Sequence, residues 1–340
     1  MKKAQTLEVT TLAGGKDAGF TDGVGADAKF ASPRDVAIDA FGNCYVADTN
    51  NHAIRKITSD GKVTTLAGFE EGYMDGEGEK ACFSKPEGLA LGPKGDLYVA
   101  DTENNRIRKI TFHKQSTVVT TVAGCGSEGF ADKSGTNAKF DRPSKVAVDV
   151  SGNIFVADTG NGRVRKIAPE GMVSTIATVD SITEGFTPAG VAHDSNENVY
   201  VSDTNNSRIC MLKALDGWLS VITLSGSKKY DFNDEMEKIR CVDGSGSKAR
   251  FAAPHGLAVG PDGNIYVADY WNHRIRVIST KDGKIKVSTL AGCEDGFGDG
   301  NAKSAKFSYP LGVAVDPAGN VFVADTNNHR IRKIFCSASS

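Results

Sequence analysis

Six copies of one short pattern account for nearly the whole sequence. Each copy contains a variant of Val-Ala-Asp-Thr-Asn-Asn followed by Arg-Ile-Arg-Lys-Ile. The central aspartate of the six copies lies at Asp48, Asp101, Asp158, Asp203, Asp269 and Asp325. A period of about 50 residues is typical of repeated sheets arranged around an axis. We therefore predict one closed array of six similar units, which we number one to six in chain order.

Each copy has the pattern of four short strands. In the second copy, residues 88–91 are apolar, a Gly-Pro-Lys-Gly-Asp turn follows, and residues 97–100 form a second apolar run. Residues 106–110 alternate in character, and residues 118–123 are rich in β-branched side chains. Such strands, joined by short hairpins, form one antiparallel blade. The predicted fold class is all-β: a six-bladed β-propeller with four antiparallel strands per blade.

The two ends of the sequence complement each other. The chain stops after the third strand of the sixth copy, and a matching fourth strand, Val-Thr-Thr-Leu-Ala, occurs at residues 9–13. We therefore expect the N-terminal strand, at about residues 7–14, to complete the last blade and close the ring. This organisation assigns residues 7–335 to a single domain and leaves residues 1–6 and 336–340 as flexible termini.

The clearest copy, residues 319–332, reads Gly-Asn-Val-Phe-Val-Ala-Asp-Thr-Asn-Asn-His-Arg-Ile-Arg. This pattern resembles the NHL repeat, and the resemblance extends over all six copies. It implies a six-bladed β-propeller. Relatives include RNA- and protein-binding modules of tripartite-motif ubiquitin ligases, extracellular sensor and adhesion domains, and a zinc-dependent peptide-amidating lyase. The resemblance therefore does not select one activity.

Charge and composition narrow the function classes. The formal net charge is −2, whereas proteins that bind nucleic-acid backbones generally carry a basic excess. No apolar run approaches the ~20 residues that span a membrane, and the first residues lack the apolar core of a secretory signal. We expect a monomer without a nucleic-acid or membrane partner and without a cofactor. We expect a cytoplasmic location; the alternative is an exported domain whose signal has been removed.

The seven cysteines have no zinc-motif spacing. They are expected to be mostly free thiols in a reducing compartment, and one or two disulfides in an exported domain are the alternative.

The repeated polar side chains are expected to be structural, because a residue present in every blade serves the blade. The repeated aspartate ends a strand, where it suits hydrogen bonds to loop amides and to an arginine on the next strand. Candidate arginines at matching positions are Arg106, Arg163, Arg208, Arg274 and Arg330, and blade one has Ala53 there. Histidines recur in the same loop at His52, His273 and His329, and we expect them to lie too far apart to share a zinc ion.

The connections between blades carry a second repeated element, typified by Asp-Gly-Val-Gly-Ala-Asp-Ala-Lys-Phe-Ala-Ser-Pro at residues 22–33. The Asp-Gly pair predicts a turn, followed by a short helical stretch that presents Ala and Phe to the sheet. These turns lack the alternating oxygen ligands of a calcium loop, so we interpret them as structural. Together the connections are acidic, which disfavours nucleic acid on the face where they lie.

Departures from the repeat point to a binding surface. The connection before blade four is short, and Cys210-Met211-Leu212 replaces Arg-Lys-Ile in that blade. The connection before blade five is the longest and contains Tyr230 and Phe232, and blade five has Tyr270-Trp271 in place of Thr-Asn. A short loop beside a long one predicts a notch in which these aromatics anchor a partner. The alternative is that Tyr270 and Trp271 pack under the long loop.

Charged residues gather where the inner strands begin, around the expected channel mouth. They are Arg34, Asp35, Glu87, Lys145 and His255, and His193 lies further along the inner strand of blade four. A polar ligand could use this rim, although solvated charges without a ligand are the alternative. His193 is more typical of a satisfied core residue than of a catalytic base.

These observations favour a non-enzymatic scaffold that binds a protein or peptide through the long-loop face. The alternative is a metal-dependent lyase or lactonase-like hydrolase at the channel mouth, for which Asp35, Glu87, His193 and His255 are the candidate ligands. An RNA-binding module is the third hypothesis, and the acidic connections disfavour it.

Overall fold

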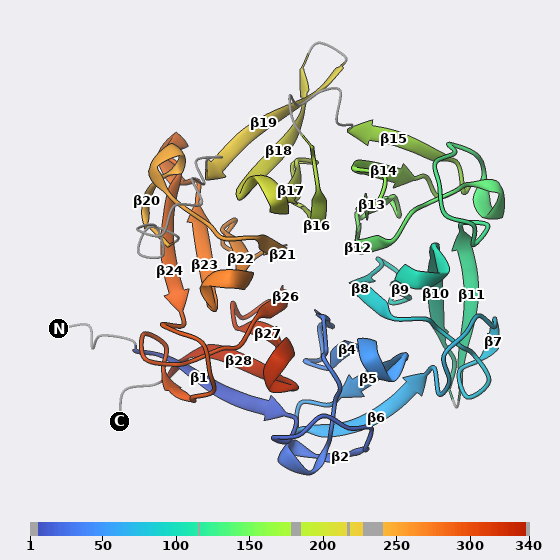
Figure 1. Cartoon of the computed structure of the whole chain (residues 1–340), viewed down its shortest axis with the longest axis horizontal. Helices are drawn as coiled ribbons and strands as arrows, with labels where there is room; N and C mark the ends of the chain where they lie inside the picture. The colour runs from blue at the N-terminus through green and yellow to red at the C-terminus, as the bar shows by residue number, and fades with distance from the viewer. Residues whose placement is uncertain (1–5, 115, 178–184, 216–217, 227–240, 338–340) are drawn as a thin grey trace.

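Six antiparallel sheets surround a central axis (Figure 1). The computed structural model describes residues 6–114, 116–177, 185–215, 218–226 and 241–337. The inner strands are β3 (Asp35–Ile38), β8 (Pro86–Leu91), β12 (Pro143–Val148), β16 (Pro188–His193), β21 (Pro254–Val259) and β26 (Pro310–Val315). The second strands are β4 (Cys44–Asp48), β9 (Leu97–Asp101), β13 (Ile154–Asp158), β17 (Val199–Asp203), β22 (Ile265–Asp269) and β27 (Val321–Asp325).

Each blade continues outward through a third and a fourth strand. The third strands are β5 (Ala53–Ile57), β10 (Arg106–Phe112), β14 (Arg163–Ile167), β18 (Arg208–Leu215), β23 (Arg274–Ser279) and β28 (Arg330–Ser337). The outer strands are β6 (Lys62–Ala67), β11 (Thr117–Ala123), β15 (Val173–Ala177), β19 (Trp218–Gly226), β24 (Lys286–Ala291) and β1 (Thr6–Ala13). The predicted six-bladed propeller is therefore confirmed.

Four blades have a fifth strand that the sequence analysis did not predict. The preceding connection adds a two-residue strand to the outer edge of blades one, two, five and six. These strands are β2 (Gly23–Val24), β7 (Gly76–Glu77), β20 (Gly244–Ser245) and β25 (Gly300–Asn301). They come from the Asp-Gly element, whose extended residues reach the neighbouring sheet edge. The connections therefore cover blade edges as well as linking the blades.

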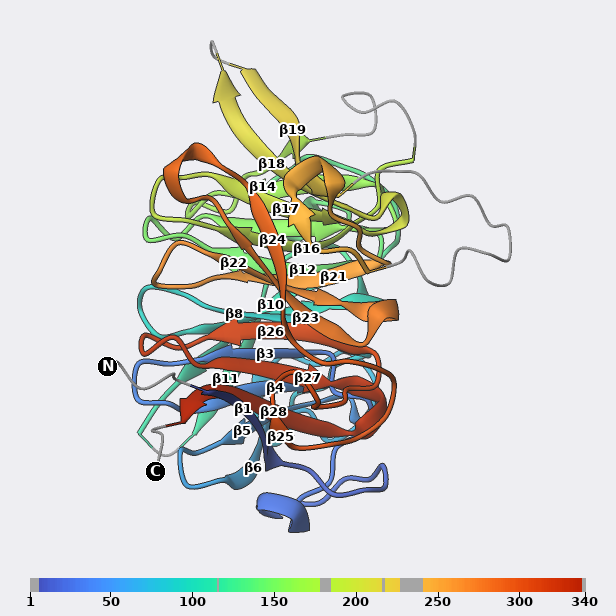
Figure 2. The ribbon, with the colours of Figure 1, turned by 90° about the vertical axis from the view of Figure 1, so that its left-hand side faces the viewer.

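The N-terminal strand closes the ring, as predicted. β1 lies between β25 and β28, with Val9 opposite Ile334. Val9 and Ala13 are completely buried in the core between neighbouring blades. Both ends of the chain consequently reach the same blade (Figures 1 and 2). One sheet is thus built from residues separated by nearly the full length of the sequence.

Buried aromatic residues from the connections fill the spaces between blades. Each of five connections supplies one completely buried phenylalanine: Phe30, Phe83, Phe140, Phe251 and Phe307. Short 3-10 helices such as Gly25–Asp27 and Gly135–Asn137 precede two of them. This confirms the predicted packing of Ala and Phe onto the sheets, and the buried apolar clusters each contain residues of neighbouring blades.

The repeated aspartate binds a completely buried arginine, but this arginine is not the one that we predicted. In blade two, Asp101 accepts a hydrogen bond of 2.6 Å from Arg108 Nη1 and one of 2.8 Å from the backbone N–H of Ser84. Arg106 instead lies over the ring of Tyr73, with its guanidinium carbon 3.6 Å from the ring centroid. The side chain of Arg108 begins two residues further along β10, and its length brings the guanidinium back to the buried strand end.

The same buried aspartate–arginine pair recurs in five blades. The buried arginines are Arg55, Arg108, Arg165, Arg276 and Arg332. Each also binds the aspartate of its own blade's covering connection, as Arg108 does with Asp75 at 2.7 Å. Two carboxylates therefore hold each buried guanidinium, and the acidic turns of the connections have this structural role. Blade four has Cys210 in place of the arginine, and the connection before it has no Asp-Gly pair.

The loop histidines link adjacent blades instead of approaching one another. His52 Nδ1 accepts a hydrogen bond from the backbone of Lys85, His273 Nδ1 from that of Tyr309, and His329 Nδ1 from that of Ser32. These hydrogen bonds hold each loop to the following connection, which agrees with the structural role that we predicted.

All seven cysteines are free thiols. Within the described ranges, no helix is sufficiently long and apolar to cross a membrane.

Candidate binding site at the channel mouth

The inner strands begin on the same face as the connections and the repeated Thr-Asn-Asn turns. Pro254 at the start of β21 lies opposite Asp269 at the end of β22, and Pro86 lies opposite Asp101 in the same way. We call this side of the ring the loop face. It is the face on which the sequence analysis expected the functional residues.

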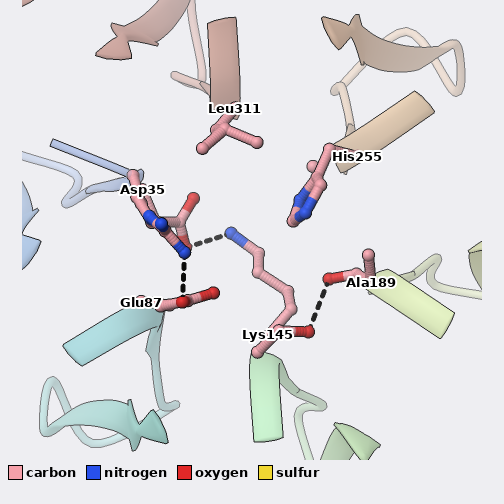
Figure 3. Close-up of a pocket in the computed structure, with 9 residues that line it drawn as sticks. Asp35, Glu87, Lys145, Ala189, His255 and Leu311 are labelled. Carbon is pink, nitrogen blue, oxygen red and sulfur yellow. Dashed lines mark hydrogen bonds and ion pairs between the residues drawn. The ribbon is translucent and has the colours of Figure 1, made fainter. Parts of the chain in front are cut away.

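Five of the predicted residues meet at the axis on this face (Figure 3). They line a small cavity that we call the axial cup, and they are Arg34, Asp35, Glu87, Lys145 and His255. Each comes from the beginning of an inner strand, and together they represent blades one, two, three and five. Leu311 of blade six adds an apolar side chain to the wall. The repeat geometry therefore brings to one point residues that are far apart in the sequence.

The charges of the axial cup are paired with one another. Lys145 Nζ donates to Asp35 Oδ2, and Arg34 Nη1 donates to Glu87 Oε1. The backbone N–H of Leu89 also donates to Asp35 Oδ2, at 2.7 Å. Two cations and two anions thus cancel within the cup. Each carboxylate is therefore paired with a cation, which disfavours binding of a divalent metal ion between them.

Burial alters the protonation of these groups. Desolvation raises the pKa of Asp35 and of Glu87, against the opposing effects of Lys145 and Arg34. Desolvation, together with Arg34 and Lys145, lowers the pKa of His255 to about 3. His255 is consequently neutral near pH 7 and adds no charge to the cup.

The cup is too narrow to hold a whole metabolite. Its solvent-accessible volume is about 10 Å³, which is roughly the space that one water molecule needs. Two polar atoms of residues that line the cup, Asp35 Oδ1 and Arg34 Nε, are buried without a hydrogen-bond partner among the described residues. A single polar group, such as the tip of a side chain, is the size of ligand that this volume suits.

An aromatic cluster continues from the cup across blade five. The ring of Tyr270 lies 6.3 Å from His255 and 5.0 Å from Tyr309, centroid to centroid. Tyr309 in turn meets His273 edge to face at 4.5 Å. Trp271, next in the chain, is 52% exposed. We call Tyr270, Trp271, Tyr309 and His273 the aromatic step.

Tyr309 was not among the site residues predicted from the sequence. A signal for it was present, because the other connections have Ser32, Lys85, Arg142 or Ala253 at the equivalent position before proline. This position has positive φ, and a large aromatic residue there departs from the pattern. Tyr270 packs against its neighbours, whereas Trp271 is exposed. Tyr230 and Phe232 lie outside the described residues.

His193 does not join the other predicted residues. It is the last residue of β16, opposite Val199, and therefore lies at the other end of the inner strand. Its Nε2 lies 2.8 Å from the carbonyl oxygen of Val148, and its ring packs against Phe155. This location suits the core interpretation of His193. Among the described residues, no three His, Cys, Asp or Glu side chains gather closely enough to hold a metal ion.

The protonation of His255 predicts a pH-dependent stability. Because its folded pKa is lowered from 6.5 to about 3, the unfolded chain binds the proton more readily between these values, and stability falls as pH falls below 6.5. Between pH 7 and pH 5 this residue should account for a loss of about 2 kcal/mol. The raised pKa values of Asp35 and Glu87 act in the opposite direction.

The measurement is urea unfolding at several pH values for the wild type and for His255→Phe, which retains an aromatic ring beside Tyr270. The difference between the two proteins isolates the histidine from the carboxylates. Between pH 7 and pH 5, the stability of the wild type relative to that of His255→Phe should fall by about 2 kcal/mol. Parallel curves would mean that His255 titrates equally in both states.

Comparison with known proteins agrees with the repeat pattern. A family model described as NHL repeat matches residues 83–110, 140–167, 187–210, 251–278 and 307–334. Protein SUPPRESSOR OF QUENCHING 1, chloroplastic, from Arabidopsis thaliana is 33% identical over 324 residues, covering 89% of this chain and 30% of that protein. NHL repeat-containing protein 2 from Gallus gallus is 30% identical over 315 residues, covering 89% of this chain and 38% of that protein. The chain thus spans about a third of the length of these relatives.

A solved structure shares the architecture. A protein of unknown function from Bacteroides thetaiotaomicron superposes with a TM-score of 0.76 at 22% identity, covering 98% of this chain and 77% of that one. This similarity concerns the fold alone. With its six repeats, its closed ring and these matches, the chain belongs to the NHL-repeat family of six-bladed β-propellers.

Proposed function

We propose that this propeller is a non-enzymatic interaction module that binds a protein or peptide through its loop face. The observation that carries the proposal is the aromatic step beside the axial cup. Trp271 is 52% exposed, although tryptophan is costly to leave in water and is enriched at the centres of protein interfaces. The connections and turns around it provide a broad surface on a rigid scaffold.

The axial cup would give such a complex its specificity. A partner that lies across the aromatic step can place one polar side chain over the cup. There, Asp35 Oδ1 offers an acceptor and Arg34 Nε a donor, both on buried side-chain atoms. Buried polar groups discriminate strongly against ligands that leave them unpaired. The apolar contact would supply affinity, and the cup would select the residue that enters it.

The hydrolase or lyase alternative receives less support from the geometry. It requires metal ligands or a general base at the axis, and His193 lies at the opposite end of its strand. Asp35 and Glu87 are each held by a cation, and the low pKa of His255, about 3, makes it a weak base. An elemental analysis of extensively dialysed protein separates the two hypotheses. One tightly held zinc, calcium, manganese or iron per chain would favour the enzyme.

The binding proposal predicts a large effect of the aromatic pair. Peptides selected from a displayed random library on the wild-type protein should bind the double variant Tyr270→Ala/Trp271→Ala at least ~30-fold more weakly, as expected for an interface hot spot. The melting temperature of the double variant should stay close to that of the wild type, which would show that the blade remains folded. Binding is measured by fluorescence anisotropy or calorimetry.

A matched control comes from the opposite face. Phe41 is 86% exposed in the hairpin between β3 and β4, so Phe41→Ala removes a comparable aromatic surface without touching the loop face. It should leave peptide affinity unchanged. Selected peptides that bind the double variant as tightly as the wild type would place the site elsewhere on the propeller.

A further inference from the structure

In five blades, the connection protects the outer edge of the sheet in one repeated way. An aspartate carboxylate accepts hydrogen bonds from the backbone N–H and the hydroxyl of a threonine on the outer strand. In blade two, Asp75 binds Thr121 at 3.0 Å and 3.1 Å. The other four pairs are Asp22 with Thr65, Asp132 with Thr175, Asp243 with Thr289, and Asp299 with Thr11. This covering prevents other strands from pairing with the edge.

Blade four lacks this protection among the described residues. The register places Thr223 of β19 opposite Cys210, as Thr121 lies opposite Arg108 in blade two. No carboxylate of the described residues accepts a hydrogen bond from Thr223, and no described strand pairs with the outer side of β19. The connection before this blade, residues 178–187, contains no Asp-Gly pair, and its two acidic residues, Asp180 and Glu184, lie outside the described residues. Thr223 is correspondingly exposed.

The length of β19 distinguishes it from the protected outer strands, since β11 and β15 share its lack of charged residues and of proline. At nine residues it is the longest outer strand, and its sequence, Trp-Leu-Ser-Val-Ile-Thr-Leu-Ser-Gly, has no charged residue and no proline. Ile222 is 37% exposed on it. The β18–β19 hairpin projects beyond the neighbouring blades (Figures 1 and 2). Charges, prolines and short strands are the usual devices against edge pairing, so this edge is suited to receiving a strand.

In blade four, the guanidinium of Arg208 lies beside Asp203 and Thr223, where the other blades have their buried arginine. Because Cys210 replaces the buried arginine, Arg208 takes over: its Nε donates to Asp203 at 2.8 Å and its Nη1 donates to the hydroxyl of Thr223 at 3.2 Å. The buried arginines of the other blades each hold two carboxylates, for example Asp101 and Asp75 on Arg108. Among the described residues, Arg208 holds only Asp203. A second carboxylate at Thr223 would reproduce the arrangement of the other five blades.

We propose that the outer edge of β19 is a docking site for an extended segment of a partner protein that carries an Asp-Gly pair. The segment would add a strand to blade four, and its aspartate would accept hydrogen bonds from Thr223 and Arg208. The chain's own connections define this ligand, because they supply the same carboxylate to the equivalent threonines. Main-chain pairing provides the affinity of such strand addition, and side chains provide its specificity. The site lies at the outer rim, away from the aromatic step, and does not depend on the proposed function of the loop face.

The probe is a fluorescent peptide with the sequence of residues 71–80, Glu-Gly-Tyr-Met-Asp-Gly-Glu-Gly-Glu-Lys, which covers blade two in the folded chain. It should bind the full-length protein saturably, measured by fluorescence anisotropy. A matched peptide with asparagine in place of its aspartate should bind at least tenfold more weakly. Equal binding of both peptides would overturn the role of the carboxylate, and no saturable binding of either would overturn the proposal itself.

Two variants locate the peptide. Thr223→Pro removes the outward N–H, a substitution that sheet edges tolerate, and Ile222→Lys places a charge on the same edge as a second test. Both should abolish peptide binding while circular dichroism remains unchanged. Thr223→Val keeps the N–H and should retain part of the affinity. Undiminished binding to folded Ile222→Lys and Thr223→Pro proteins would exclude this edge.

Hydrogen exchange and mass measurement separate the other possible occupants. Without peptide, the amide of Thr223 should exchange faster than that of Thr121, which is bonded to Asp75, and added peptide should slow it. Protection of Thr223 in the isolated monomer would show that the chain covers its own edge. A concentration-dependent dimer that Thr223→Pro abolishes would identify a second copy as the occupant. Either result would overturn the proposal.

Discussion

Replacing Asp101 by alanine is expected to lower the free energy of unfolding by about 3–5 kcal/mol, the cost of removing one partner of a buried ion pair. Asp101 and Arg108 are both completely buried, and their closest atoms lie 2.6 Å apart. The carboxylate also accepts hydrogen bonds from the backbone of Ser84 and from the side chain of Asn104. Its removal would leave three donors without their partner in a place that water does not reach.

Urea unfolding of wild type and Asp101→Ala measures this effect. Arg108→Ala should destabilise by a similar amount, whereas Arg106→Ala should cost less, ~1–2 kcal/mol, since Arg106 stacks on the half-exposed ring of Tyr73 and donates to the carbonyl oxygens of Asn104 and Cys125 but pairs with no buried carboxylate. This comparison tests which of the two arginines supports the blade. An unchanged stability of Asp101→Ala would be incompatible with a structural role for the repeated aspartate.

Blade four offers an internal comparison. Its aspartate, Asp203, pairs with Arg208, whose side chain is 18% exposed. Water can therefore compensate part of the charge when the carboxylate is removed. Asp203→Ala should destabilise the protein less than Asp101→Ala. The same substitution in two blades thus separates the effect of burial from the effect of the residue type.

Deleting residues 1–13 is expected to abolish the cooperative folding of the propeller. β1 supplies the fourth strand of blade six, and its Val9 and Ala13 are completely buried. Burial of an aliphatic side chain contributes roughly 1.5–3 kcal/mol, and Leu7 and Leu12 of the same strand also pack against the core. The summed loss approaches the total stability of a typical domain, about 5–15 kcal/mol. The deletion also exposes the edge of β28 to intermolecular pairing.

A circular permutant distinguishes the loss of the strand from the loss of the N-terminus. In this variant residues 1–13 follow residue 340, so that β1 still pairs with β28, where Thr6 lies opposite Ser337. It should unfold cooperatively at nearly the wild-type temperature, measured by circular dichroism and calorimetry. Cooperative unfolding of the deletion variant at that temperature would mean that five complete blades and an open one are sufficient.

Much of the candidate site could be anticipated from residue types at repeat positions. Asp35, Glu87, Lys145 and His255 occupy the first positions of inner strands, and a propeller brings these positions to the axis. The same reasoning did not show which end of an inner strand a residue occupies relative to the channel mouth. His193 was therefore included among the candidate metal ligands, although it lies at the opposite end of its strand. Which charges neutralise each other also depends on side-chain reach across the channel, which the pattern does not specify.

The repeat alone determined the number of blades, the strand order within them and the closure of the ring by the N-terminus. The sequence contains this information because the repeat period and the strand pattern can be read from neighbouring residues. The absence of a fourth strand after the last copy, and its presence at residues 9–13, can be read in the same way. Three-dimensional packing decided that Arg108 and not Arg106 pairs with Asp101, that connections cover neighbouring edges, and that β19 remains uncovered by any described strand. These outcomes depend on contacts between residues distant in sequence, where distance, burial and side-chain length select one partner among several of the same chemical type.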